Sequence, residues 1–350
     1  MRSSTRPDGL WAVVLAGGIG SRFWPVSTRE RPKQLLPLAS ERPLIVDTVE
    51  RATGITDLER IRILAGDHLA APFKTVLPEV PSTSYWVEPE ARGTCPVLAW
   101  AAWEIHKQDP DGVMISLHSD HQIEPLSAFQ DTLWSAARIA RDQDLLLCIG
   151  AVPDRVEPAF GHVEPGSPIE GFGVDAHRVT AFHEKPDAQT AARYVADGYL
   201  WNTGIFVWKA STFLEEVAKH APEVAQHLPL LEDSPEAFFS AVPVCVVDKA
   251  VMERSDRVAT VRATFSWDDV GGWEALSRTR TPDAAENVRY GDAVVVDGTG
   301  NIVFADGGRI VLFDVDDLVV VRTDDTTLVL PRERAGDIKA LLAKLDGAQT

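Results

Sequence analysis

Short apolar runs alternate with longer amphipathic stretches along the first 150 residues. Runs such as Trp11 to Leu15 and Val113 to Leu117 are contiguous and apolar, which is typical of buried strands. Apolar residues at helical spacing lie between such runs, as in Pro43 to Thr53 and Val97 to His106. This alternation predicts a doubly wound, Rossmann-like α/β domain with a mostly parallel, mixed sheet covered on both faces. The same pattern predicts further strands at Ile61 to Leu64, Tyr85 to Val87 and Leu145 to Gly150, and a helix at Ala128 to Ala140.

Two changes of pattern divide the rest of the chain. From Ala151 onward strand-like pieces and loops dominate, and Ser211 to His220 predicts an amphipathic helix with Ser211 as its N-cap. Beyond Pro282, short apolar runs separated by turn residues predict a small all-β domain, closed by a helix from Arg334 to Leu345. We therefore expect a flexible tail at residues 1–9, a large α/β domain at 10–282 and a small domain at 283–350. The strands expected in the small domain are Ala293 to Val296, Ile302 to Phe304, Ile310 to Leu312, Leu318 to Val321 and Thr327 to Leu330.

Composition and charge narrow the functions that are open to this chain. With 52 acidic against 34 basic residues, the formal net charge of −18 argues against a nucleic-acid surface. A nucleotide is still allowed, because a few local cations and a divalent metal can hold it. No apolar run approaches membrane-span length and the first nine residues lack a signal-peptide core, so a cytoplasmic protein that binds no membrane is expected. Cys95, Cys148 and Cys245 are odd in number and far apart, and we expect reduced core thiols.

A glycine-rich loop follows the first predicted strand. Gly17, Gly18 and Gly20 allow positive φ and let backbone N–H groups approach a ligand closely. Arg22 and Lys33 add a forked cation and a mobile one, a combination that suits phosphate. A Walker A loop needs Lys directly after its last Gly, where this chain has Ser21. A dinucleotide fingerprint needs another Gly at the position of Phe23, so neither motif is present. For the glycines alone, an ordinary strand-to-helix turn is the alternative.

Carboxylates at predicted strand ends are candidate metal ligands. Asp120 lies in a His-Ser-Asp-His segment that ends a predicted strand, where a carboxylate suits a hard cation such as Mg²⁺. His118 and His121 in that segment raise zinc as an alternative, but no other His or Cys cluster completes such a site. Asp268 and Asp269 follow much later and, taken alone, fit a capped turn before the next helix.

The order Gly-Gly-x-Gly-x-Arg-x-x-Pro, followed by Pro-Lys-Gln, resembles the signature of nucleotidyltransferases that join a nucleoside triphosphate to a sugar 1-phosphate. The Phe23-Trp24-Pro25 and Pro32-Lys33-Gln34 forms look most like the branch that uses GTP and mannose 1-phosphate. The resemblance covers nearly the whole chain. It implies a nucleotidyltransferase domain at 10–282 and a β-helix-like domain at 283–350, which can join subunits and would allow a homodimer. It also implies a short form, because 350 residues leave no room for the isomerase domain of longer family members.

The resemblance further implies a catalytic and metal-binding set. Asp120 and Asp269 match the two metal-binding aspartates of the family, with Mg²⁺ or another divalent cation as the expected cofactor. Arg22 and Lys33 complete the expected catalytic residues. His118 stands where the family usually has Pro.

A second segment is expected to lie against the nucleotide base. Glu88 to Pro96 resembles the family's base-contacting segment, although Gly93 replaces its Asn. Taken alone, this segment fits a helix entry with Thr94 as N-cap. The nucleotide-binding residues that the resemblance implies are Leu15, Ala16, Gly17, Gly18, Gly20, Ser21, Arg22, Lys33, Glu88, Arg92 and Thr94.

Three later segments resemble the family's sugar-phosphate half. Carried over by position, Glu184 and Asn202 would bind sugar hydroxyls, Lys185 would pair with the sugar phosphate, and Gly161 would offer backbone contact. Polar groups matched to hydroxyls can discriminate strongly, because a wrong sugar leaves them unpaired. Without the resemblance, Glu184 and Lys185 would read as an exposed ion pair and Asn202 as a turn residue.

The reaction implied is in-line attack of a sugar-1-phosphate oxygen on the α-phosphorus of the triphosphate, with pyrophosphate leaving. The nucleophile is already an anion, so no general base is needed, and charge neutralisation is the main task. Two alternatives remain open at this stage. One is a sister enzyme with another base or sugar, and the other is a non-catalytic sugar-nucleotide sensor.

Overall fold

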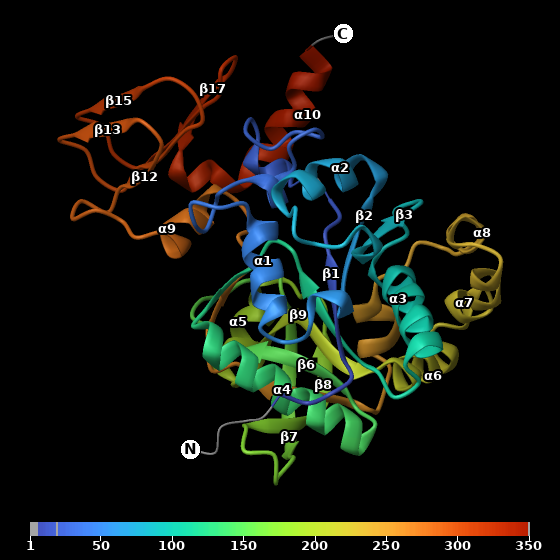
Figure 1. The fold of residues 1–350 in the computed structure, drawn as a ribbon. Helices are drawn as coiled ribbons and strands as arrows, with labels where there is room; N and C mark the ends of the chain where they lie inside the picture. The colour runs from blue at the N-terminus through green and yellow to red at the C-terminus, as the bar shows by residue number, and fades with distance from the viewer. Residues whose placement is uncertain (1–5, 19, 349–350) are drawn as a thin grey trace. The chain divides into compact units, whose positions relative to one another are not determined.

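The computed structural model, shown in Figure 1, describes residues 6–18 and 20–348 of the chain. Its residues group into two compact units, which are described separately below. Unit 1 comprises Met1–Gly17, Thr48–His118 and Ile123–Trp267, and unit 2 comprises Gly18–Asp47, Ser119–Gln122 and Asp268–Thr350. The chain thus passes from one unit to the other inside the glycine-rich loop and again at each aspartate segment predicted to bind metal.

Unit 1 is built on a nine-stranded mixed sheet of order β3-β2-β1-β4-β9-β6-β10-β8-β7. Strands β3, β2, β1 and β4 are parallel, whereas β9 runs antiparallel between β4 and β6. Leu15 pairs with both Leu64 and His118, so the carboxyl ends of three strands lie level at one edge, where open α/β sheets bind ligands. The strands are β1 (Leu10–Leu15), β2 (Ile61–Gly66), β3 (Tyr85–Glu88), β4 (Val113–His118), β6 (Leu146–Ala151), β7 (Gly161–Pro168), β8 (Ala176–His183), β9 (Leu200–Lys209) and β10 (Val258–Arg262). Strands β5 (Gln122–Glu124) and β11 (Ser266–Asp268) form a separate pair.

Helices cover the sheet, and a large buried cluster lies under α3 and α6, which pack side by side in Figure 1. This cluster joins Trp11, Met114 and Trp208 of the sheet to Leu98 and Phe213 of the two helices. The helices are α1 (Leu44–Thr53), α2 (Asp67–Val76), α3 (Thr94–Gln108), α4 (Leu126–Gln143), α5 (Ala188–Ala196), α6 (Ala210–His220), α7 (Pro222–Ala225) and α8 (Pro235–Ala241). Shorter helical turns are η3 (Leu58–Arg60), η4 (Ser82–Ser84), η5 (Leu228–Glu232) and η6 (Asp248–Met252).

Three local expectations differ from the structure. Helix α6 begins at Ala210 after Lys209, so Ser211 is a helical residue and not the N-cap. Helix α5, which the sequence did not predict, is capped by the Asp187 side chain accepting from Thr190 N. Residues 1–5 of the expected flexible tail lie outside the described residues, but 6–9 are anchored. Arg6 pairs with Asp57 at 3.0 Å, and Gly9 O accepts from Val113 N at 2.9 Å.

Unit 2 contains the five predicted C-terminal strands, β13 to β17, at their expected places, and a further strand, β12, that the sequence did not predict. Strands β12, β14 and β16 form a parallel ladder, β13 and β15 form a second one, and β17 pairs antiparallel with β16. Asn301 is fully buried and links successive coils, because its side chain donates to Asn287 Oδ1 and accepts from Leu318 N, each at 3.0 Å. The strands are β12 (Val288–Tyr290), β13 (Ala293–Val296), β14 (Ile302–Ala305), β15 (Ile310–Phe313), β16 (Leu318–Arg322) and β17 (Thr327–Pro331).

The core of unit 2 gathers apolar residues from distant parts of the chain. Phe23 and Trp273 meet edge to face at 5.0 Å, and Phe304 of β14 lies 5.3 Å from Trp273. The helical elements of this unit are η1 (Ser21–Phe23), η2 (Lys33–Leu35), η7 (Trp273–Ala275), α9 (Leu276–Thr279), η8 (Arg332–Asp337) and α10 (Ile338–Ala348). The predicted closing helix is therefore two helices in succession. In the part of the chain that the structure describes, no helix is long and apolar enough to span a bilayer.

Candidate active site

The glycine-rich loop leaves the carboxyl end of β1. Ala16 N donates to Leu64 O at 2.9 Å, which holds the start of the loop against β2. Gly18 and Gly20 have φ values of 87° and 73°, in the region that favours glycine. A Cβ on Gly20 would also lie 2.4 Å from the Cβ of Lys33, so this glycine is needed for close approach as well. Ile19 lies outside the described residues.

Lys33 is a buried cation within unit 2, with 6% of its surface exposed. Its Nζ donates to Asp120 Oδ2 at 2.9 Å and to the backbone oxygen of Asp269 at 2.8 Å. The neighbouring Gln34 donates from Nε2 to Gly18 O at 3.1 Å and so ties the loop to the same segment. The structure therefore brings Lys33 together with both predicted metal-binding segments. Gln34 was not predicted as a site residue, although it stands in the Pro-Lys-Gln motif.

The two adjacent aspartates of the second segment have different surroundings. Asp268 accepts from Val270 N at 2.8 Å and from Arg278 Nε at 2.7 Å, and it thereby holds the turn in which Val270 has φ 45°. Asp269 has no side-chain hydrogen bond among the described residues. Burial raises the pKa of the Asp269 carboxyl, the Lys33 ammonium opposes that rise, and the negative charges of Asp268 and Asp120 add to it.

This arrangement suits a hard cation. The carboxylates of Asp120 and Asp269 lie close enough to interact, the buried Lys33 ammonium offsets only part of their charge, and Asp269 still has both oxygens available among the described residues. Oxygen donors of this kind are what Mg²⁺ and similar ions prefer. The capped turn predicted for the aspartate pair is therefore formed by Asp268, whereas the Asp269 carboxylate is available to bind a cation.

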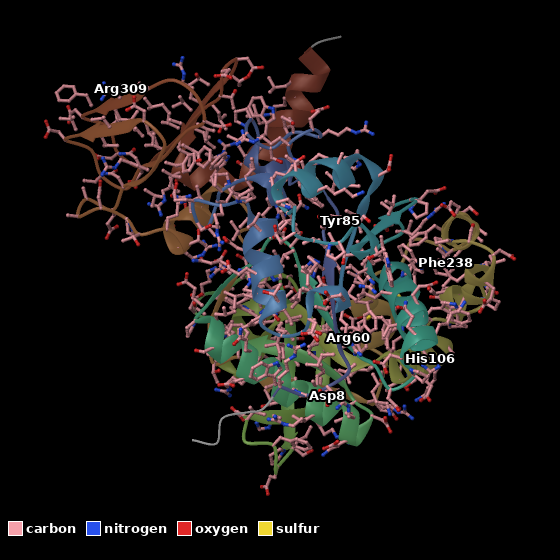
Figure 2. The ribbon with its side chains drawn as sticks, viewed as in Figure 1. Asp8, Arg60, Tyr85, His106, Phe238 and Arg309 are labelled. Carbon is pink, nitrogen blue, oxygen red and sulfur yellow. The ribbon has the colours of Figure 1, made fainter. Side chains whose placement is uncertain are left out.

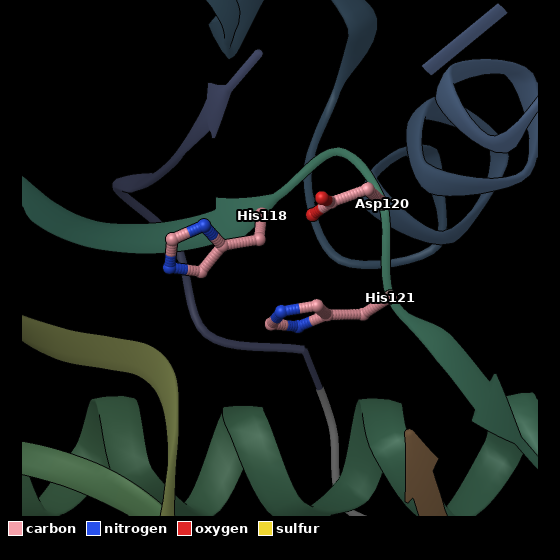
Figure 3. A group of neighbouring side chains, drawn as sticks. All are labelled: His118, Asp120 and His121. Carbon is pink, nitrogen blue, oxygen red and sulfur yellow. The ribbon is translucent and has the colours of Figure 1, made fainter. Parts of the chain in front are cut away.

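Asp120 follows the carboxyl end of β4, and Figure 3 shows its side chain together with those of His118 and His121 in one short turn. The possible ligand atoms of these three residues lie within 4.8 Å of one another. Four consecutive positions carry them, so their proximity is largely dictated by the turn itself. Asp120 is already engaged by Lys33, which favours the hard-cation reading over a zinc site.

Arg22, in η1, is exposed, and its Nη1 lies 3.5 Å from Gly271 O. The Gly271 carbonyl is two residues beyond Asp269, so the Arg22 side chain reaches the same turn. Ser21 begins η1 directly after Gly20. An exposed guanidinium held by one long hydrogen bond can turn toward a phosphate at little cost.

The Glu88 to Pro96 segment differs from expectation at the start of α3. The residue before this helix is Gly93, and the Thr94 hydroxyl accepts from Val247 N at 3.0 Å, so Thr94 is not the N-cap. Gly93 has φ 86°, and a Cβ there would lie 2.4 Å from Cys245 O. The Asn that the family carries at this position would therefore clash with the backbone, which explains the glycine.

Arg92 and Glu88 are held by their own segment. Arg92 donates from Nε to Phe239 O at 2.9 Å and pairs with Glu90, while its backbone N–H approaches Glu88 Oε1 at 3.4 Å. Burial raises the pKa of Glu88, and the Arg92 N–H opposes the rise. The segment is thus an ordered loop within unit 1. The three cysteines of the chain are free thiols, with Cys95 and Cys148 buried and Cys245 only half-buried.

The four residues predicted for the sugar phosphate lie together within unit 1. Gly161 pairs with Asn202 across β7 and β9, and a Cβ on Gly161 would lie 2.8 Å from Glu184 Oε2. Lys185 pairs with Glu184 through its side chain, and Lys185 takes a φ of 50°. Glu184 N donates to Glu253 Oε1 at 2.9 Å, which fixes the strand end.

Asp248 joins this group, and sequence reasoning did not single it out. Its Oδ1 accepts from Asn202 Nδ2 at 2.9 Å, and the Asn202 Oδ1 accepts from Gly204 N at 3.0 Å. Burial and the nearby Glu184 charge raise the pKa of Asp248 to about 6, against the Lys185 and Asn202 contacts that lower it. The segment from Asp248 to Glu253 resembles a motif of the family, and this resemblance could have identified Asp248 as a site residue.

Replacing Asp248 by Asn is expected to stabilise the protein in a pH-dependent way. The pKa of Asp248 is raised from 3.8 to about 6, so its contribution to stability is present below pH 3.8 and is lost as pH rises through 6. Asn keeps the Asn202 hydrogen bond but does not ionise. The free energy of unfolding of the variant should therefore exceed that of the wild type by up to about 3 kcal/mol at pH 7.5 and by much less at pH 4.5. Urea unfolding at both pH values measures this, and a difference that does not change with pH would contradict it.

A glycine-rich loop with a buried lysine and paired aspartates beside it is typical of nucleotide-phosphate chemistry. A model of the family described as nucleotidyl transferase matches residues 11–286. A second model, described as the MannoseP isomerase/GMP-like beta-helix domain, matches residues 291–345. Two independent models thus cover the two successive parts of the chain.

Individual relatives agree with these matches. The chain is 32% identical to mannose-1-phosphate guanylyltransferase of Escherichia coli, over 94% of this chain and 72% of that protein. It is 33% identical to mannose-1-phosphate guanylyltransferase ManC of Salmonella typhimurium strain LT2, over 97% and 74% respectively. The crystal structure of mannose-1-phosphate geranyltransferase from Thermus thermophilus superimposes with a TM-score of 0.89 at 31% identity, covering 97% of this chain and 99% of that one. The chain therefore belongs to the nucleotidyl transferase family and, within it, to the mannose-1-phosphate guanylyltransferases.

Proposed function

We propose that this chain transfers a guanylyl group from GTP to mannose 1-phosphate, giving GDP-mannose and pyrophosphate. The observation that carries the proposal is the buried Lys33 ammonium, bound to Asp120 and to the Asp269 segment directly beside the glycine-rich loop. A phosphate chain needs such a group of donors and cations. The family to which the chain belongs supplies the choice of base and sugar.

The residues of unit 2 handle the triphosphate. The amides of Gly18, Gly20 and Ser21, with Arg22, bind the leaving pyrophosphate, and Lys33 neutralises the transferring phosphoryl group. Asp120 and Asp269 hold Mg²⁺, whose charge when bound offsets that of both phosphates. Each of these groups acts by position and charge, because the attacking sugar phosphate is already an anion.

The residues of unit 1 bind the remaining parts of the two substrates. Gly161, Glu184 and Asn202 bind the mannose, with the Asn202 amide held in place by Asp248, and Lys185 pairs with the sugar phosphate. The guanine and its ribose lie against Leu15, Ala16, Gly17, Glu88, Arg92 and Thr94. Because the wrong sugar would leave buried polar groups unpaired, this part of the site supplies selectivity. We further propose that the protein acts in the cytoplasm as a homodimer.

Pyrophosphate release in the presence of Mg²⁺ tests the proposal directly. The nucleotides GTP, ATP, UTP, CTP and dTTP are each paired with mannose 1-phosphate and with glucose 1-phosphate. Geranyl diphosphate is added as a donor, since the name of the Thermus thermophilus protein specifies a geranyl group. We expect the fastest release with GTP and mannose 1-phosphate. Faster release with another pair, or with geranyl diphosphate, would contradict the proposed substrates, and no release with any pair would contradict the activity.

A further inference from the structure

A cavity of about 420 Å³ lies in unit 1, and none of the residues that line it has been given a role above. It is lined by Arg62 of β2, by Trp86 of β3, and by Trp100, Glu104 and Gln108 along α3. Figure 2 labels Arg60, directly before β2, and Tyr85, at the start of β3. The volume is within the range of small-molecule sites in proteins, which begins at about 300 Å³.

Arg62 is an unusual residue for the position it occupies. It pairs in register with Val13 of β1, in the parallel half of the sheet, and only 8% of its surface is exposed. Its Nη1 donates to the carbonyls of Glu59 and Ile61 at 2.7 and 2.9 Å. Among the described residues, however, it has no acidic partner, and its Nε has no acceptor. Burial lowers the pKa of the guanidinium, which reflects the cost of an uncompensated charge.

The walls around Arg62 are aromatic. Its guanidinium lies 4.8 Å from the Trp11 ring and 5.3 Å from the Trp86 ring, which offsets part of its desolvation. The Trp86 and Trp100 rings are 5.4 Å apart. The indole N–H of Trp100, a residue only 5% exposed, also has no acceptor among the described residues. The Arg62 Nε and the Trp100 indole N–H are enclosed by protein, so what this cavity offers a ligand is the charge of Arg62, a cation without an acidic partner among the described residues, between aromatic rings.

Glu104 gives another part of the cavity wall acceptor character. Burial raises the pKa of its carboxyl, the Lys107 charge opposes that rise, and the Glu232 charge adds to it. A ligand that satisfied all of these groups would carry an acidic group toward Arg62, a flat ring against the indoles and a hydroxyl or amino group toward Glu104. Apolar residues in place of Arg62 would pack a sheet face at lower cost, so stability alone does not account for this arginine.

We propose that this cavity is a binding site for a small aromatic anion, a flat ring that carries a phosphate or a carboxylate. The acidic group pairs with the Arg62 guanidinium, and the ring packs against Trp86 and Trp100. The proposal does not depend on the activity proposed above, because it concerns residues that have no part in that reaction. Phosphate and carboxylate forms share this chemistry, and the probes below separate them.

The test is calorimetric titration of the full chain with phenyl phosphate, benzoate, GMP and inorganic phosphate, each with tryptophan fluorescence as a second readout. We expect at least one of the three aromatic anions to bind with a Kd below about 10 mM, and inorganic phosphate to bind at least about 10-fold more weakly than that probe. Preference for phenyl phosphate and GMP would identify a phosphate ligand, and preference for benzoate a carboxylate. Absence of binding by all three aromatic probes would overturn the proposal.

Matched variants assign the binding to this cavity. Arg62→Gln should weaken the aromatic probe at least about 10-fold. Arg60→Gln should leave it within about 2-fold, because Arg60 is paired with Asp109 at 3.1 Å and does not line the cavity. Removing the buried charge should leave the melting temperature of Arg62→Gln unchanged or higher. If that variant fails to fold, Trp86→Ala, which removes a ring that lines the cavity, must show the weakening instead. Equal binding by the wild type and the folded variant would overturn the proposal.

Discussion

Replacing Asp269 by Asn is expected to lower kcat by about 10³-fold or more while leaving the fold intact. Asn has nearly the shape of Asp but lacks the charge that a divalent ion requires. The Asp269 carboxylate has no side-chain hydrogen bond among the described residues, so its replacement breaks no structural contact. Burial already raises the pKa of this carboxyl, and a neutral side chain should therefore leave the melting temperature unchanged or higher. Steady-state kinetics at saturating substrates and a thermal melt measure the two effects.

Asp268→Asn is the matched control, one residue away. Asp268 accepts from Val270 N and from Arg278 Nε, so the neutral variant loses an ion pair and weakens the turn. We expect a loss of about 1–3 kcal/mol in stability and a kcat that stays within about 10-fold of the wild type. The two variants should thus separate, one losing turnover and the other stability. An Asp269→Asn variant that kept most of its turnover would remove this residue from the metal site.

The parts of the fold that local patterns determine were predictable. Strands β1 and β4 are contiguous apolar runs, and the five later strands from β13 to β17 follow regular turn signals, so all of them lie where the sequence places them. The position of β9 could not be predicted, because its antiparallel insertion between β4 and β6 depends on contacts distant in sequence. Both predicted N-caps were wrong. Ser211 lies one residue inside its helix, and Thr94 instead binds a backbone N–H from a distant segment.

The sequence also predicted which residues would lie close together, but not which of two adjacent residues would have a structural role. Lys33 and Asp120, 87 positions apart, meet because the segments that carry them pack together within unit 2. The choice between Asp268 and Asp269 as the structural member of the pair depends on the turn at Val270, which no propensity reveals. The burial of Arg62 could not be predicted either, because the sequence of β2 is otherwise that of an ordinary apolar strand. The roles of these residues in binding and catalysis remain predictions.

Replacing Lys33 by Met is expected to lower kcat by about 10²- to 10³-fold. Met has a similar length and can fill the buried position, but it removes the cation that we propose neutralises the transferring phosphoryl group. In the wild type the Lys33 ammonium binds Asp120 and approaches the Asp269 carboxylate, so it occupies space and charge that a metal ion also needs. Without it, the two carboxylates repel each other, and a divalent ion gains more by binding. The concentration of Mg²⁺ that gives half-maximal activity should therefore stay the same or fall.

This combination of effects separates two possible roles of the lysine. If Lys33 acts on the phosphoryl group, the loss of kcat persists at saturating Mg²⁺, whereas a lysine that only organised the metal ligands would be replaced by excess metal. Arg31→Gln is the control, since Arg31 precedes Lys33 by two residues but pairs with Asp306, directly after β14, with Nη2 3.2 Å from Oδ1. Its kcat should change by less than about 3-fold, because this partly exposed ion pair does not involve Lys33, Asp120 or Asp269. Recovery of wild-type kcat by Lys33→Met in excess Mg²⁺ would contradict a direct role in charge neutralisation.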